Sequence, residues 1–210
     1  MAVDCRFERC KFGGWRVRDG EPCFGGGPHR SHYLDCNFDG ANLRHFSPGR
    51  ARFERCTFHR VIISDGYQPE AEFVDCSFSG RITDTVFWAR APFSQVLNEF
   101  VRNDFTQCVL DGVSFRGGIR VCDQRLPESA EYRYVADLAA VLNHIRVRRP
   151  DPQHRLLQKV IIALLASDLG TGQSDAFYVP RCFGEGSHES DLAAKWFREA
   201  CGLLPHRGVD

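Results

Sequence analysis

The chain has 210 residues, of which 43% are hydrophobic and 26% charged, so it can bury a core and is not disordered as a whole. Basic and acidic side chains balance at 27 each, and residues 1–125 hold 17 basic and 16 acidic ones. This balance argues against a basic nucleic-acid-binding surface and against an acidic, DNA-like one. The first ten residues do not read as a signal peptide, and the apolar run at 160–166 is too short for a bilayer. We therefore expect a cytoplasmic protein with no membrane contact.

The N-terminal part of the chain repeats a five-residue unit, in which a small residue is followed two positions later by a large apolar one. The first unit contains Cys5 and Phe7, and a late one contains Val113 and Phe115. A period of five belongs neither to a helix, with 3.6 residues per turn, nor to a strand, with two. A second, longer period spaces Cys36, Cys56 and Cys76 evenly, and also Phe38, Phe58 and Phe78, with four of the short units in each step.

Four units of five residues would make one side each of a square coil, and successive coils would stack about 4.8 Å apart. The pattern, which includes "GANLR" at 40–44, resembles the pentapeptide-repeat family over about residues 1–123. The resemblance implies a right-handed quadrilateral β-helix, so we predict a mainly β solenoid of about five coils over 1–125. The two columns expected inside it are Cys5, Cys36, Cys56, Cys76 and Cys108, and Phe7, Phe38, Phe58, Phe78 and Leu110.

The cysteines of this column are expected to be buried, reduced thiols that pack as small apolar groups. A zinc site is disfavoured because Cys5 and Cys10 lack a second pair at a usual spacing. A reducing cytoplasm disfavours disulfides. Cys23 lies in a glycine-rich segment and should react first with a thiol reagent. We predict no metal and no cofactor.

Two excursions, at 13–32 and 84–102, interrupt the repeat in the register that keeps Cys108 in its column; a second register places the later insertion at 94–102. Pro48 and Gln68 stand where Phe or Leu belongs, so one edge is irregular along its length. Trp, Tyr and Arg are enriched at binding hot spots, which favours a partner-binding edge. The plainer interpretation is that Trp15 and Trp88 fold down and cover an apolar corner. The predicted partner-binding residues are Trp15, Arg16, Arg18, His29, His45, Tyr67, Trp88 and Arg90.

Residues 126–210 lose the five-residue period and show helical spacing instead. We expect amphipathic helices at about 129–148, after a cap at Asp151, and at 190–201, with a short strand at 176–180. The helices should pack together and cover the open end of the last coil. No spacing shows that a Cys–His nucleophile pair forms here. The residues it would draw on are Cys182, Cys201, His144, His154, His188 and His206.

Three functions fit these observations. The prediction is a non-enzymatic protein–protein interaction or scaffold module of the pentapeptide-repeat type, with an unidentified protein partner and with an end-to-end homodimer through the N-terminal coil left open. The resemblance also implies an alternative, a DNA mimic that protects a topoisomerase such as gyrase. Five coils would give that mimic only about 24 Å of length. A small enzyme or ligand binder on the irregular edge is the third function.

Overall fold

The computed structural model describes residues 2–16, 24–92, 94–129, 132–178 and 188–202. The chain divides into two compact units, Met1–Glu128 and Ser129–Asp210, where the sequence predicts a division at residue 125. Within the described residues, no helix combines the length and the apolar character needed to cross a membrane.

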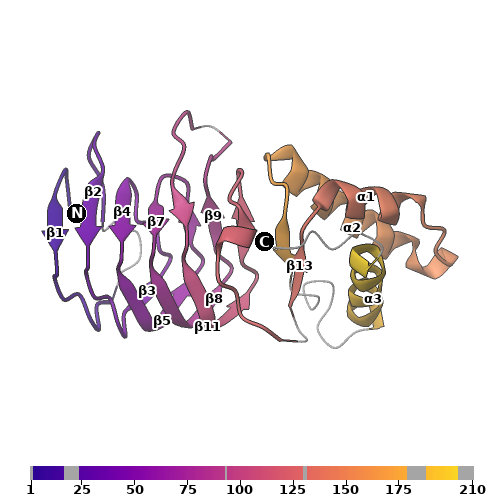
Figure 1. Ribbon diagram of the computed structural model, residues 1–210, viewed down its shortest axis with the longest axis horizontal. Helices are drawn as coiled ribbons and strands as arrows, with labels where there is room; N and C mark the ends of the chain where they lie inside the picture. The colour runs from indigo at the N-terminus through magenta and orange to yellow at the C-terminus, as the bar shows by residue number, and fades with distance from the viewer. Residues whose placement is uncertain (1, 17–23, 93, 130–131, 179–187, 203–210) are drawn as a thin grey trace. The chain divides into compact units, whose positions relative to one another are not determined.

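The first unit is built from parallel strands in three sheets, which Figure 1 shows as a row of strands running from indigo to magenta. Sheet A contains, in spatial order, β1 (Arg6–Glu8), β2 (Ser31–Leu34), β4 (Ala51–Glu54), β7 (Glu72–Val74) and β10 (Phe100–Val101). Sheet B contains β11 (Asp104–Asp111), β8 (Ser77–Thr83), β5 (Thr57–Ser64) and β3 (Asn42–Arg44). Sheet C contains β12 (Ser114–Arg116), β9 (Val86–Trp88) and β6 (Tyr67–Gln68), and a short 3-10 helix, η1 (Val121–Asp123), follows.

The longer period of the sequence is the pairing register of the middle strands. Phe53 lies opposite Phe73 in sheet A, and Phe58 lies opposite Phe78 in sheet B. The paired rings stack with their centroids 5.0 Å and 4.8 Å apart, and these side chains are buried. Stacked rings of adjacent strands therefore form the core of the unit, because the inward positions of every layer coincide.

One residue in the left-handed backbone region turns the chain after each strand of sheet A. These residues are Arg9, Asp35, Arg55 and Asp75, all at a φ of 52°, and Arg102 at 54°. Their charges alternate in sign along the stack, and we call them the corner ladder. Arg55 Nε donates to Asp35 Oδ1 at 2.8 Å, and Arg102 Nε donates to Asp75 Oδ1 at 2.6 Å. The attraction between these opposite charges thus helps to offset a left-handed backbone conformation that is unfavourable for residues other than glycine.

The predicted fold class, a mainly β right-handed quadrilateral β-helix, is wrong. Four equal sides would give four parallel sheets, whereas the described residues of the first unit form three, of five, four and three strands. With three α-helices in the second unit, the chain has an α/β-like fold and is not a closed solenoid. Among these described residues, the fourth sheet is missing at the side next to sheet C. There Pro48 cannot donate a backbone hydrogen bond, and the excursion after β9 replaces repeat units.

The predicted columns also differ from the structure at the N-terminal end. Asn37 N donates to Cys10 O at 2.9 Å, and Phe12 stacks on Phe38 at 4.9 Å. The neighbours of Cys36 and Phe38 in the preceding layer are therefore Cys10 and Phe12. Phe7 belongs instead to sheet A, where it lies opposite Tyr33, and Cys5 immediately precedes that strand. The alignment failed because two neighbouring sides of the first layer carry the same Cys-x-Phe pattern.

The same displacement occurs at the other end of the stack. Cys108 lies opposite Gly80 in the second half of sheet B, and Leu110 lies opposite Ile82, so neither continues the predicted column. Phe105 stacks on the ring of Phe78 at 4.6 Å instead. The later excursion follows β9 rather than Thr83, which is closer to the second register, with its insertion at 94–102.

The second unit consists of three helices and an antiparallel strand pair. Its elements are β13 (Arg133–Val135), α1 (Leu138–Val147), the 3-10 turn η2 (Pro152–His154), α2 (Arg155–Gly170), β14 (Ala176–Tyr178) and α3 (His188–Gly202). The three helices share one apolar core, as predicted. The first helix begins later than predicted, because the Asp137 side chain accepts from Ala140 N at 2.9 Å and caps it there. Asp151 makes no side-chain cap bond. That the helices cover the last coil stays a prediction.

Candidate functional site

The structure does not gather the predicted partner-binding residues at one place. The ring of Trp15 packs on Phe12 and Phe24, and the backbone of Arg16 bridges to Asn42 beside sheet B. His29 is exposed, and its backbone N–H donates to Asp4 Oδ1 at 3.1 Å.

Two further predicted residues stand apart from these. Arg90 is exposed at the start of the excursion after β9. Arg18 lies outside the described residues, and so does Cys23, which was predicted to react first with a thiol reagent.

Three of the predicted residues do lie together at the sheet C side. Tyr67 is 50% exposed, and its ring stands edge-on to Trp88 at a centroid distance of 6.4 Å. Trp88 is only 5% exposed, so the plainer interpretation holds for this tryptophan. His45 Nδ1 lies 3.9 Å from Asp65 Oδ2, at the turn that leads into Tyr67. We call the exposed group, His45, Asp65 and Tyr67, the Tyr67 surface.

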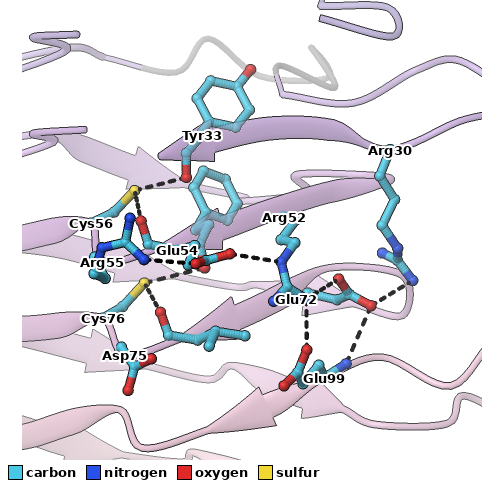
Figure 2. Close-up of polar contacts among 12 residues, drawn as sticks. Arg30, Tyr33, Arg52, Glu54, Arg55, Cys56, Glu72, Asp75, Cys76 and Glu99 are labelled. Carbon is cyan, nitrogen blue, oxygen red and sulfur yellow. Dashed lines mark hydrogen bonds and ion pairs between the residues drawn. The ribbon is translucent and has the colours of Figure 1, made fainter. Parts of the chain in front are cut away.

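The outer face of sheet A carries an ion-pair network that the sequence reasoning missed (Figure 2). Arg52 Nη1 donates to Glu72 Oε2 at 2.9 Å and to Glu99 Oε2 at 2.7 Å, and Arg52 Nε donates to Glu54 Oε2 at 3.2 Å. Burial lowers the pKa of Arg52, but the three carboxylates outweigh it and the net pKa is raised. The interval from Arg52 to Glu72 was the available signal, because it equals the longer period of the sequence and is the pairing register of sheet A.

A second missed cluster holds the later excursion against the stack. Arg30 Nη1 donates to Glu70 O, and Arg30 Nη2 donates to Asn98 Oδ1 at 2.8 Å. Asn98 is buried, and its Nδ2 donates to the carbonyls of Pro69 and Trp88 at 2.8 and 2.9 Å. Arg30 and Asn98 are far apart in the sequence, so no local pattern could reveal their contact. Arg30 Nη2 also lies 3.3 Å from Glu72 Oε1. This cluster is structural, because its contacts hold the two excursions together and against sheet A.

The N-terminal end of the first unit exposes apolar side chains. Phe7 and Phe12 are only half buried, whereas Tyr33 and Phe38, which stack on them from the next layer, are buried. Val3 is 51% exposed and Trp15 is 37% exposed. We call Val3, Phe7, Phe12 and Trp15 the N-terminal end surface. Exposed apolar side chains that lie together are typical of interaction sites.

The cysteines of the first unit are free thiols where the structure describes them. Cys56 Sγ donates to Tyr33 O at 3.2 Å, as Figure 2 shows. Cys76 Sγ donates to Phe53 O at 3.4 Å. Burial raises the pKa of Cys36 to about 11 and that of Cys108 to about 12. The thiols of Cys36 and Cys108 therefore stay protonated near neutral pH and act in packing, since the thiolate is the reactive form.

Among the described Cys and His residues of the second unit, the structure brings two histidine rings together. His154 and His188 lie 5.4 Å apart between ring centroids. Cys201 is half buried, and burial raises the pKa of its thiol. Cys182 and His206 lie outside the described residues. Across the described residues no three His, Cys, Asp or Glu side chains converge to hold a metal ion.

A comparison with models of known protein families finds no match to this chain, and a search of curated proteins finds no significant relative. The resemblance to the pentapeptide-repeat family therefore stays a prediction.

Proposed function

We propose that this chain is a non-enzymatic protein-binding module that acts in the cytoplasm and binds a protein partner through the Tyr67 surface. The observation that carries the proposal is the setting of Tyr67, which is half exposed yet rests edge-on against a buried tryptophan. Arg116 in turn lies over the Trp88 ring, 5.9 Å from its centroid. An aromatic side chain held in this way loses little rotamer freedom on binding, which favours affinity.

The surroundings of Tyr67 support the same function. His45 and Asp65 are each more than half exposed and supply the polar rim that surrounds an aromatic anchor in protein interfaces. His45 follows β3 and Asp65 follows β5, and the parallel pairing of these two strands in sheet B fixes their spacing. The free thiols of the described residues suit a reducing compartment. On sheet A, Glu54, Glu72 and Glu99 are all paired with Arg52, which favours a protein-binding role over imitation of DNA.

The test is capture of partners from the native host with the full chain as bait. Replacement of Tyr67 by Ala should weaken capture of the main partner roughly 10- to 30-fold, as loss of an interface hot spot does. The melting temperature should stay unchanged because the side chain is half exposed. Ile62→Ala, at a residue 41% exposed on sheet B, is the matched control and should leave capture intact. Equal capture by Tyr67→Ala and the wild type would contradict the proposal.

A further inference from the structure

Strand β1 is an edge strand whose outer side pairs with no other strand among the described residues. On its inner side it pairs in parallel with β2, where His32 N donates to Cys5 O at 2.8 Å and Arg9 N donates to Leu34 O at 2.9 Å. In a parallel ladder, alternate residues bond to the same neighbour, so Arg6 and Glu8 direct their backbone N–H and C=O groups outward. An edge of this kind is a template for another strand.

The sequence of β1 is self-complementary in one arrangement. In an antiparallel pair centred on Phe7, Arg6 of each copy lies opposite Glu8 of the other, and Phe7 lies opposite its own equivalent. Residues directly opposite each other point to the same face, so each Arg–Glu pair lies on the outer face and the two rings meet on the inner face. A parallel pair in register would place Arg opposite Arg and Glu opposite Glu.

The side chains already have the orientation that this pairing needs. Arg6 Nε lies 2.6 Å from Glu8 Oε1, and both side chains are well exposed, at 61% and 43%. The two charges therefore lie on one face of the strand. In the dimer, each can pair with the opposite charge of the other copy instead of with its neighbour in the same strand. Phe7 is half buried against Tyr33, with a centroid distance of 4.9 Å, and a second ring would cover its open side.

We propose that two copies of this chain associate through their β1 strands, antiparallel and centred on Phe7, with a two-fold axis at that residue. A closed two-fold contact uses the same patch on both copies and stops at a dimer. The contact covers the N-terminal end surface, not the Tyr67 surface, so self-association and partner capture can be tested separately.

Sedimentation equilibrium of the full chain over a range of concentrations tests the proposal. The wild type should form a dimer. Arg6→Glu and Glu8→Arg each place like charges opposite one another twice in the dimer, and each should weaken self-association roughly 10- to 100-fold. An equimolar mixture of the two variants should dimerise again, because every facing pair is then of opposite sign. The double variant Arg6→Glu, Glu8→Arg should also dimerise.

Arg81→Glu reverses an exposed charge on sheet B and is the matched control, with no expected effect on self-association. Circular dichroism of each variant checks that the first unit is folded. A wild type that stays monomeric throughout, a single variant that dimerises as well as the wild type, or a mixture that fails to restore the dimer would each overturn the proposal. None of these results bears on partner capture at Tyr67.

Discussion

The two ends of the first unit stop the same stack of strands in different ways. At the C-terminal end, Asn103 takes the position next to Cys76, and its Oδ1 accepts from Cys76 N at 3.0 Å. Gln124 closes over it: its Oε1 accepts from Asn103 N and Nδ2, both at 3.1 Å, and its Nε2 donates to Phe100 O at 3.1 Å. At the N-terminal end, β1 and two half-buried rings face outward.

The difference shows two solutions to one physical problem. The last strand of a sheet has backbone groups and apolar side chains that its neighbour on one side cannot satisfy. At the C-terminal end, the buried amide side chains of Asn103 and Gln124 satisfy several of these groups beside sheet A. The N-terminal end keeps an exposed strand edge, and in our proposal a second copy completes it.

Removal of an aromatic side chain should lower the free energy of unfolding much more at the C-terminal end than at the N-terminal end. Phe105, at the closed end, is fully buried, so Phe105→Ala should lower the free energy of unfolding by about 3–5 kcal/mol. Phe7→Ala, measured at a concentration where the chain is monomeric, should cost less, because this ring is only partly buried. Urea denaturation measures both. Equal costs would show that the two ends are equally closed.

Removal of the Gln124 amide, which bonds to Asn103 and Phe100, should have the next largest effect on the free energy of unfolding. Gln124→Ala leaves buried groups of Asn103 and the carbonyl of Phe100 without their partner, and should cost about 1–3 kcal/mol. Gln107→Ala, at an exposed glutamine of sheet B, should cost almost nothing and serves as control. The measurement is again the free energy of unfolding in urea. A neutral Gln124→Ala would mean that Asn103 alone suffices.

The corner ladder extends to both ends of the first unit. Its contribution to the stability of the fold should be smaller and should depend on pH. A hydrogen bond from Arg55 lowers the pKa of Asp35, and one from Arg102 lowers the pKa of Asp75. A depressed folded-state pKa stabilises the fold above the ordinary value of 3.8, and this contribution is lost as pH falls through the folded pKa. The melting temperature should therefore drop below about pH 4. The double variant Asp35→Asn, Asp75→Asn should flatten part of that drop, and an unchanged slope would contradict this assignment.

Thiol labelling sharpens the comparison without changing stability. Cys5 and Cys10 are only partly buried at the N-terminal end, so they should react before Cys36 and Cys108, which are buried and have raised pKa values. Mass spectrometry of peptides after a short exposure to a maleimide gives the order. Labelling of Cys108 at the rate of Cys5 would show that the C-terminal end opens as readily as the N-terminal one.

The sequence predicted the register of the middle strands because identical spacing makes it unambiguous: Phe58 and Phe78 can only pair one way. It could not assign the ends, since the patterns at Cys5 and Cys10 are alike and only the sheet to which each strand hydrogen-bonds distinguishes them. The predicted four-sided closure was wrong for a similar reason. Pro48 and Gln68 mark an irregular side, but a five-residue pattern does not show whether strands pair there.

The candidate site was predictable only in part. Tyr67 was identified from its residue type and its place in an irregular segment, and the structure leaves it exposed. Trp88 has the same signals yet is buried, because contacts from Arg116 and the following excursion decide its exposure. The Arg30–Asn98 cluster joins two excursions whose lengths do not follow the repeat. Contacts of that kind depend on tertiary structure and leave no periodic trace.

The alternating signs of the corner ladder give this stack a parity. The ring contacts of its core repeat with every layer, but the charge at the corner changes sign from one layer to the next. Arg55 is followed by Asp75, and an arginine returns only in the layer after that, at Arg102. A tandem duplication of one layer of the chain would preserve every ring contact and still set two like charges side by side. A duplication of two successive layers would preserve both patterns. The unit by which such a chain can lengthen without electrostatic penalty is therefore a pair of layers.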